Sequence, residues 1–372
     1  MLTGWYYWVN VAFWMPAVFV AFAYWFSYAF APAASPWLLA GIATLMCWLI
    51  VYVGIRGVEL SVTVSSIAAV CKVAVLFFFG VLGVAYGIKY GLANDFSLKS
   101  FLPSVNNTTQ YIAVIVYNLL GFELIGSIGS KIENPGRTVP LMTIVSGAVI
   151  TALYVFGTFG VLAAIPADTV DTVDGFYFAL VELCTVFGSA GQAGFYVVIV
   201  IAMLTLISNM VSWSLGANEA LIAAGLDRRS RFLGHRNRRY GTADNLYLVM
   251  GVLSTLLIVL NFALSGNANE IFWTILSFST LIFLLPYLFM FPSAVKLRYS
   301  DPGTPRQYRV GKRGNAGIWV CAVLCELCVA AAVFFLFKDS APGFPRWMLI
   351  IGTALTTVAG FWLYAAGKTE QG

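Results

Sequence analysis

The chain has 372 residues, of which 60% are hydrophobic and only 10% are charged, and its formal net charge is +5. Because an ordinary soluble domain carries about 25% charged residues, this composition excludes a soluble protein. It predicts an all-α polytopic membrane protein instead. No soluble segment is long enough to carry a nucleic-acid-binding surface, so the basic excess is assigned to loops between membrane spans.

Apolar runs of about 20 residues predict about ten membrane-spanning helices. They cover residues 5–30, 36–55, 61–87, 111–130, 139–165, 194–216, 246–264, 271–291, 318–337 and 347–366. The first run has no positively charged leader and is longer and more aromatic than the core of a signal peptide, so we expect it to remain as a span. Residues 175–188 fit a short re-entrant or interfacial helix.

Arginine and lysine are concentrated in two loops, residues 227–244 and 296–313, whereas the loop at residues 168–174 is rich in aspartate. By the positive-inside rule the two basic loops are cytoplasmic, the acidic loop lies outside, and both termini are then cytoplasmic. We therefore predict a multi-pass protein of the cell membrane, whose basic loops face the headgroups of the lipid bilayer. His235 lies in a basic loop, which favours a solvated side chain over a metal ligand.

The third predicted span contains a lysine, Lys72, well inside the membrane. A lysine at such a depth is costly unless it reaches an interface, pairs with an acid or is neutral. Two interpretations remain open. The side chain extends to the cytoplasmic surface, which is a long reach, or the amine gains and loses a proton during transport, because burial favours its neutral form.

Residues 118–140 read NLLGFELIGSIGSKIENPGRTVP and form the least regular span. Three glycines are spaced between Gly121 and Gly129, and Glu123 is an acid at membrane depth. A backbone that loosens inside a bilayer must be buried in protein or line a wet cavity, and an ionisable residue there is a functional-site candidate. We therefore predict a broken helix with a polar binding site near the membrane midplane, as in secondary transporters. Glu123 is either a structural acid or a partner for a cationic substrate group or for Lys72.

Polar side chains in two later spans are further candidates. They are Thr205, Ser208, Asn209 and Ser212 in residues 194–216, and Ser277 and Ser279 in residues 271–291. The first group serves either helix packing or a cation or proton site, because hydroxyl and amide groups in a span also bond to neighbouring helices. The second group is expected to line a pathway. No nucleophile elbow, phosphate loop or metal-ligand cluster occurs, so we predict neither an enzyme nor a cofactor.

The stretch GFELIGSIGSKIENPGRTVP resembles the sixth helix, with its Asn-Pro turn, of amino acid permeases in the amino acid, polyamine and organocation superfamily. LSVTVSSIAAVCKVAVLF, which contains Lys72, is similar to the fifth family helix. SLGANEALIAAGLDRR followed by NRRYGTADN is similar to the end of the eighth helix and its basic loop. The resemblance covers essentially the whole chain, and the GFEL motif is most similar to that of the glutamate and aminobutyrate antiporter-like branch.

The resemblance implies a LeuT-like fold of two inverted five-helix repeats and two extra helices. Residues 1–90 correspond to the remainder of the first repeat, 109–292 to the second, and 314–367 to the two accessory helices. It also implies an amino acid or related amine as substrate, held between unwound parts of the first and sixth family helices, with protons or an exchanged amino acid as the coupling partner.

On this mapping the backbone carbonyls near Leu120, Gly121 and Phe122 receive the substrate amine. Lys72 then lies opposite Ser208 or Asn209, where sodium-coupled members hold a cation and proton-coupled members a lysine. The predicted substrate-binding residues are Leu120, Gly121, Phe122, Glu123, Gly126 and Ser277, and the predicted proton or cation coupling residues are Lys72, Ser208 and Asn209.

The chain begins at the equivalent of the third family helix, so we expect the first two helices to be absent. Either the encoded start is too far downstream or the permease is truncated, and the intact downstream matches favour a misplaced start. The predicted function is a secondary active transporter of amino acids or related amines that works by alternating access. A non-transporting membrane scaffold or remnant is the alternative, and a channel is a further one, although a single broken span argues against it.

Overall fold

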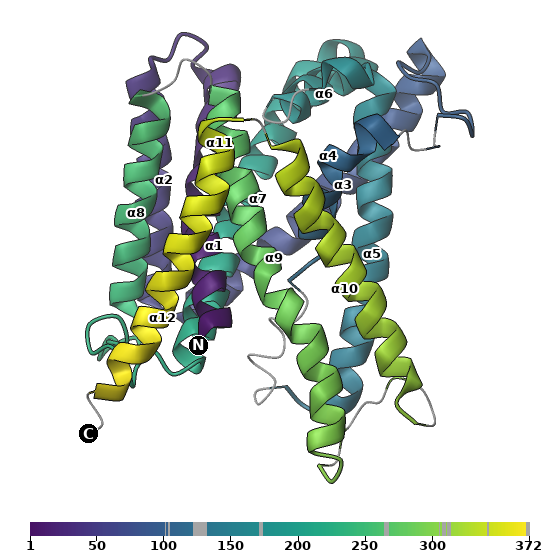
Figure 1. Cartoon of the computed structure of the whole chain (residues 1–372). Helices are drawn as coiled ribbons and strands as arrows, with labels where there is room; N and C mark the ends of the chain where they lie inside the picture. The colour runs from purple at the N-terminus through teal and green to yellow at the C-terminus, as the bar shows by residue number, and fades with distance from the viewer. Residues whose placement is uncertain are drawn as a thin grey trace.

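The structure is a computed structural model that describes residues 1–100, 102, 105–121, 132–170, 174–263, 268–304, 306, 310, 314–340 and 342–369, and these contain helices but no strand. The elements, drawn in Figure 1, are α1 (Leu2–Phe30), α2 (Pro36–Arg56), α3 (Val58–Tyr90), α4 (Val105–Asn118), α5 (Pro135–Ala164), α6 (Gly175–Cys184), α7 (Gly191–Ala223), α8 (Asp244–Ala263), α9 (Ala268–Ser300), α10 (Ala316–Asp339), α11 (Phe344–Trp347) and α12 (Thr353–Thr369).

Nine helical segments within the described residues are long and apolar enough to cross a membrane. They coincide with nine of the predicted spans, and the tenth, residues 111–130, lies partly outside the described residues. The prediction of an all-α polytopic membrane protein is therefore confirmed. The start of α1 and the end of α12 lie at one end of the bundle, and α6 and α11 lie at the other (Figure 1).

α1 is the central helix of the bundle. Of its most apolar stretch 72% is buried, whereas none of the corresponding stretch of α5 is buried. α1 packs against α2, α7, α8 and α9. Because α1 is apolar and aromatic all round, it can pack against other helices on several sides, which suits this central position. Tyr28 near its end donates to Asp174 at 3.0 Å, which ties α1 to the start of α6.

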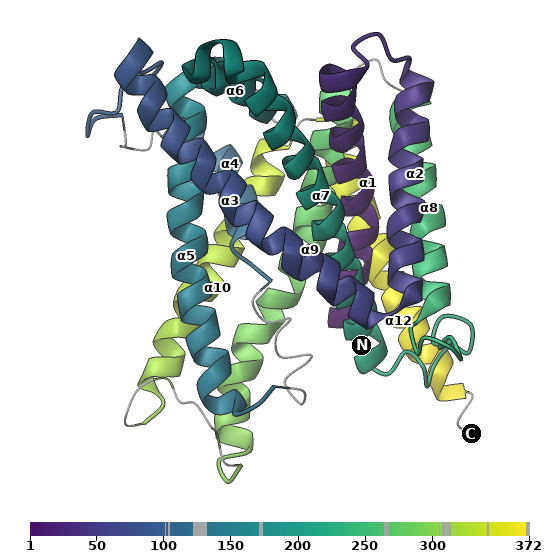
Figure 2. The same ribbon diagram turned by 180° about the vertical axis from the view of Figure 1, so that it is seen from behind.

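α3 and α5 approach each other through glycine. A Cβ atom on Gly160 of α5 would overlap the Phe79 carbonyl oxygen of α3, and one on Gly83 would lie 2.5 Å from the Gly160 Cα. Small residues allow membrane helices to pack backbone to backbone in this way. Figure 2 shows α3 running diagonally across the bundle from this contact with α5 towards α2.

α6 is a short helix that lies across the end of the bundle (Figure 1), as expected for an interfacial segment. Phe176 of α6 stacks on Trp25 of α1, with ring centroids 4.5 Å apart, and on Phe79 of α3, with centroids 4.6 Å apart. Gly188 has a φ of +59° and turns the chain from this segment into α7. The aromatic contacts therefore fix α6 over the ends of α1 and α3.

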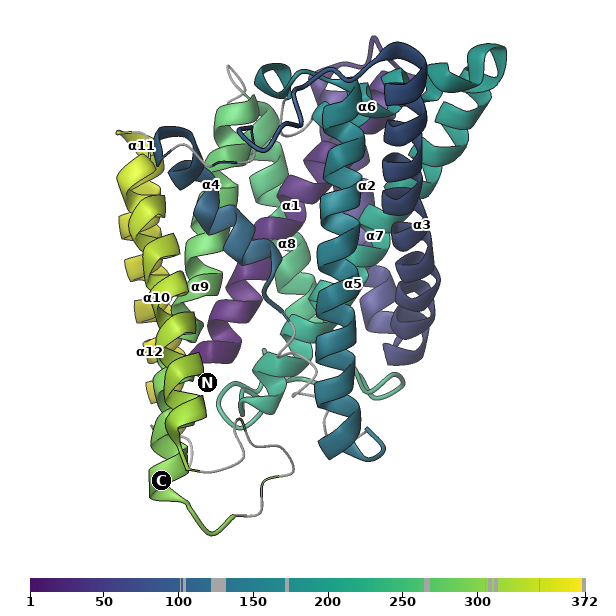
Figure 3. The ribbon, with the colours of Figure 1, turned by 90° about the vertical axis from the view of Figure 1, so that its right-hand side faces the viewer.

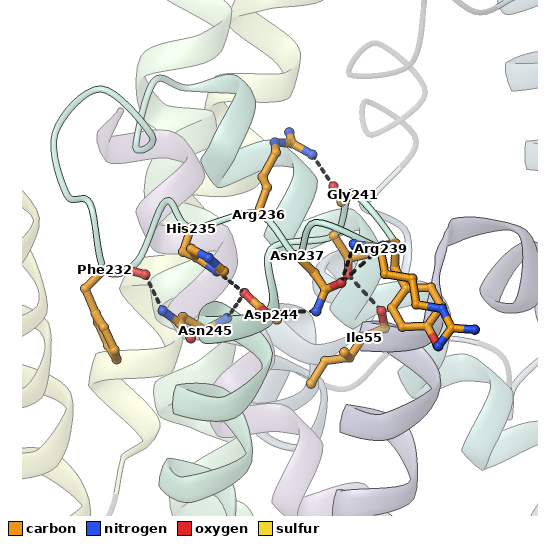
Figure 4. A network of polar contacts seen from close by, with 11 residues as sticks. Ile55, Phe232, His235, Arg236, Asn237, Arg239, Gly241, Asp244 and Asn245 are labelled. Atoms are coloured by element: carbon orange, nitrogen blue, oxygen red, sulfur yellow. Dashed lines mark hydrogen bonds and ion pairs between the residues drawn. The ribbon is translucent and has the colours of Figure 1, made fainter.

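The loop between α7 and α8 is folded around Asp244, the first residue of α8 (Figure 4). His235 Nδ1 lies 2.7 Å from one carboxylate oxygen of Asp244, and Asn237 donates to the other at 3.2 Å. Thr242 donates to the Ile55 carbonyl at 2.8 Å and so joins the loop to the end of α2. His235 is half exposed, as a solvated side chain would be, but it is also paired with an acid.

Candidate functional site

α4 is a short helix that ends at Asn118. Its 14 residues span about 21 Å at 1.5 Å per residue, less than the roughly 30 Å of a bilayer core. After Asn118 the Leu120 amide donates to the Tyr117 carbonyl at 3.2 Å, a tightened last turn. Gly121 then takes a φ of +107°, which favours glycine. α4 therefore ends three residues before the first of the spaced glycines, and the predicted break from Gly121 to Gly129 lies mostly outside the described residues.

Two of the predicted substrate-binding residues, Leu120 and Gly121, are described at this helix end. Leu120 packs against the main hydrophobic core, and a Cβ on Gly121 would lie 3.0 Å from Trp213 Cη2 of α7. Phe122, Glu123 and Gly126 lie outside the described residues. An α-helix leaves its last four carbonyl groups without intrahelical donors, so an end at this depth can offer main-chain acceptors to a ligand.

Aromatic rings enclose the end of α4. Phe283 of α9 is fully buried, and its ring meets Tyr117 of α4 at 5.2 Å, Trp213 of α7 at 5.7 Å and Tyr7 of α1 at 4.9 Å between centroids, in each case edge to face. Tyr7 is hydrogen-bonded through its hydroxyl to Tyr287 at 3.0 Å. We call these five residues the Phe283 cluster. Aromatic faces of this kind attract both apolar groups and cations.

A buried amide lies beside the Phe283 cluster. Asn10 of α1 is 1% exposed, and its Nδ2 donates to the Ser279 carbonyl at 2.8 Å and to the Tyr117 hydroxyl at 3.3 Å. Because a carbonyl can only accept, the Ser279 contact assigns the nitrogen of the amide. Oδ1 of Asn10 consequently points the other way, where it is buried and has no hydrogen-bond partner among the described residues. An unpaired buried acceptor is costly, and a donor supplied by a ligand would remove that cost.

A second polar group joins α3 to α7. Lys72 Nζ donates to Asn209 Oδ1 at 3.1 Å, and Ser212 Oγ donates to Ser65 Oγ at 2.7 Å and to the Ser208 carbonyl at 3.2 Å. The structure thus joins two of the three residues predicted to couple protons or cations, Lys72 and Asn209, whereas Ser208 is the neighbour of Asn209 in α7 and takes part only through its main-chain carbonyl. The Lys72 side chain is exposed on the described part of the molecule, and its role remains a prediction.

Ion pairs are rare in the described parts of the chain. The two that occur join His235 to Asp244 and Arg236 to Glu219, and Lys72 takes part in neither. The described residues contain no group of three or more His, Cys, Asp and Glu side chains that could hold a metal ion. The polar groups that meet between the helices are therefore mostly neutral hydroxyls and amides.

The two serines of α9 lie in different places. Ser279 is fully buried at Asn10, and its hydroxyl donates to the Asn10 carbonyl at 3.0 Å. Ser277 lines a separate cavity with Tyr111, Trp273 and Asp339. Side chains two residues apart on a helix point about 200° apart, so one serine faces α1 and the other faces away from it. Ser277 is therefore not among the residues that surround the end of α4.

Sequence reasoning missed three residues at the helix end, namely Asn10, Tyr117 and Trp213. Of these three, only Asn10 could have been recognised from the sequence, because an amide within an otherwise apolar and aromatic span needs a polar partner. Tyr117 and Trp213 carry no such signal, since aromatic residues are common throughout spans. Their position follows from the packing of α4 and α7 against α9.

The chain is similar to known membrane transporters. The probable agmatine/putrescine antiporter AguD of Lactococcus lactis subsp. lactis (strain IL1403) is 34% identical over 318 residues, which cover 85% of this chain and 66% of that protein. The glutamate/gamma-aminobutyrate antiporter of the same strain is 24% identical over 275 residues, which cover 71% of this chain and 54% of that protein. The chain therefore matches just under two thirds of the first relative and about half of the second.

A third relative, the uncharacterized amino acid permease YecA of Bacillus subtilis (strain 168), is 21% identical over 372 residues and is matched over 78% of its length. The family model described as amino acid permease matches residues 1–359. Members of that family are transporters and not enzymes. The chain is a multi-pass membrane protein, and it belongs to the amino acid permease family.

Proposed function

We propose that the protein is a secondary active transporter of an amino acid or related amine, driven by protons or by exchange, that works by alternating access around the end of α4. One observation carries the proposal: α4, at 14 residues, is too short to span a bilayer, and a positive φ at Gly121, beside Trp213 of α7, follows its end at Asn118. A helix end at this depth provides main-chain acceptors where the surrounding spans provide few polar groups.

The substrate ammonium is assigned to this helix end. Main-chain carbonyls near Leu120 and Gly121 accept from it, and the unpaired Oδ1 of Asn10, whose Nδ2 donates to the Tyr117 hydroxyl, is a buried side-chain acceptor. Trp213 and the rest of the Phe283 cluster face the apolar part of the substrate. Phe122, Glu123 and Gly126 complete the proposed set, and Glu123 is the acid that would balance the charge.

Coupling is assigned to Lys72 and its acceptor Asn209, with Ser208 next to them. A lysine whose acceptor is a neutral amide is not held in its charged form by a counter-ion, so its proton can leave during the transport cycle. The pair also links α3 to α7. Loss of the proton would therefore change the contact between two helices of the bundle.

The names of two relatives narrow the substrate class. One is named for agmatine and putrescine and the other for glutamate and gamma-aminobutyrate, and both are named antiporters. All four compounds carry a primary amine or guanidine group. We infer that this chain exchanges compounds with a cationic nitrogen. The proposal includes cytoplasmic termini, residues 1–90 as the remainder of the first repeat, residues 109–292 as the second repeat, and residues 314–367 as two accessory helices.

The test is counterflow in proteoliposomes. Vesicles loaded with an unlabelled compound are diluted into the labelled compound, with glutamate, gamma-aminobutyrate, agmatine and putrescine each tried, with and without a pH gradient. An exchanger accumulates label transiently above equilibrium. A channel equilibrates the label without overshoot, and a scaffold leaves the vesicles impermeable. Either of the last two results would contradict the proposal.

A further inference from the structure

A cavity of about 400 Å³ lies between α4, α9, α10 and the turn that follows α10. It is separate from the end of α4, and Figure 3 shows these elements meeting at the end of the bundle that carries α11. Its polar lining residues are Tyr111, Trp273, Thr274, Ser277, Asp339 and Ser340. The volume is in the range of small-molecule sites.

The cavity is negatively charged at one end. Asp339 is the last residue of α10, so its carboxylate adds to the partial negative charge at the C-terminus of that helix. Asp339 forms no salt bridge within the described residues. Two basic side chains close to Asp339 in sequence have other contacts: Arg346 donates to the Ser340 carbonyl at 2.7 Å, and Lys338 lies 5.6 Å from the Phe335 ring centroid.

The remaining lining suits the rest of a small organic cation. The rings of Trp273 and Tyr111 are the kind of surface on which ammonium groups and their adjacent methylenes bind. Ser277 provides a hydroxyl that can accept from a second N–H. Leu336 and Leu349 form an apolar floor for a short alkyl chain.

We infer that this cavity binds the ammonium group of a short alkyl amine, with Asp339 as the counter-ion. It is a second amine site, apart from the one proposed at the end of α4. Tyr111 and Tyr117 stand six residues apart on α4, about 9 Å along the helix, so one helix connects the two sites. The assignment of an amine as the ligand rests on the composition of the cavity. The further claim, that substrate binds in this cavity before it reaches the end of α4, rests on the proposed function.

Equilibrium binding of radiolabelled putrescine to the purified full chain in detergent tests the inference. Asp339→Asn removes the charge with little change in shape, and we expect the affinity of one class of sites to fall about tenfold or more, because a charge-assisted hydrogen bond is lost. Asp168→Asn, at an exposed acid outside the cavity, is the matched control and should bind as the wild type does. Asp339→Glu should retain most of the affinity.

Ser277→Ala provides an independent variant of the same cavity, and its putrescine affinity should fall by about twofold to tenfold, the effect of one neutral hydrogen bond. Wild-type binding in Asp339→Asn, or an absence of putrescine binding to the wild type, would overturn the inference. Binding that depends on Asp339 in a protein without counterflow would support the inference while contradicting the proposed transport function. Counterflow in a protein whose putrescine binding does not depend on Asp339 would support the proposed transport function and contradict this inference.

Discussion

The Lys72 ammonium donates to the Asn209 amide oxygen at 3.1 Å, and this single bond is a polar link between the middle of α3 and the middle of α7. The acceptor is neutral, so the bond satisfies one donor of the lysine without balancing its charge. A group held in this way is well suited to change its protonation, because neither the charged nor the neutral form is fixed by a counter-ion among the described residues.

Replacement of this lysine by alanine should separate binding from coupling. We expect Lys72→Ala to bind substrate, because the lysine lies on α3 and its acceptor Asn209 on α7, neither of them at the end of α4. We also expect the variant to lose the dependence of transport on pH. The measurement is the initial rate of counterflow at acidic, neutral and alkaline pH. Lys89→Ala is the control on the same helix, since Lys89 donates to the Val186 carbonyl at 3.0 Å and lies 4.9 Å from the Tyr90 ring centroid. A pH profile in Lys72→Ala equal to that of the wild type would refute the proton role.

A second prediction concerns the buried amide at the helix end. Asn10→Ala removes the bonds to Ser279 and Tyr117 and the unpaired Oδ1, so it should lower the melting temperature and weaken substrate binding about tenfold, the effect of roughly 1.4 kcal/mol. Asn261→Ala removes another buried asparagine, 3% exposed, which lies on α8. It should lower stability without changing affinity. Equal losses of affinity in both variants would mean that Asn10 acts only through the fold.

A third prediction compares the effects of two glycine-to-alanine substitutions on stability and transport, one in the turn after α4 and one in α5. Gly121→Ala places a Cβ at a φ of +107° and 3.0 Å from Trp213, which should cost about 1–3 kcal/mol and reduce the transport rate. Gly147→Ala, in α5, meets nothing within 4 Å and replaces a helical glycine, so it should stabilise the protein slightly. Thermal unfolding in detergent and counterflow measure the two effects. Normal stability and transport in Gly121→Ala would show that the turn is not needed.

The loop between α7 and α8 should open when its central acid is removed. Asp244→Ala deletes the contacts to His235 and Asn237, each worth about 1.5–3 kcal/mol when the acceptor is charged, so trypsin should cleave at the loop arginines about tenfold faster or more. Glu219→Ala breaks only the 3.7 Å pair with Arg236, which is partly exposed and worth about 0–1 kcal/mol. Its cleavage rate should stay near that of the wild type, and equal rates in the two variants would contradict the assignment.

The positions of the membrane-spanning helices could be predicted from the sequence, because the length and apolarity of a span are properties of one continuous stretch of residues. The predicted residues 36–55 correspond to α2 (Pro36–Arg56), and the end of α4 falls three residues before the first of the spaced glycines. The residues that pack around the end of α4 could not be predicted in the same way. Asn10 meets Ser279 across 269 positions of sequence, and the rotation of α1 about its own axis decides which of its side chains faces α9. Nearly uniform hydrophobicity around a helix leaves that rotation undetermined.

Ser277 illustrates the same limit. It is two residues from Ser279 and of the same type, so nothing in the sequence separates the serine that meets Asn10 from the one that lines the cavity beside Asp339. The pairing of Lys72 with Asn209 was expected from the family resemblance rather than from periodicity. Contacts between distant spans were therefore predictable only where a relative supplied the arrangement.

The glycine contact between α3 and α5 differs from the contact between α3 and α7. Because Gly83 lies against the Gly160 backbone, a larger residue at either position would push α3 and α5 apart. α3 also meets α7, where Lys72 donates to Asn209. The contact with α7, unlike the glycine contact with α5, therefore includes an ionisable group.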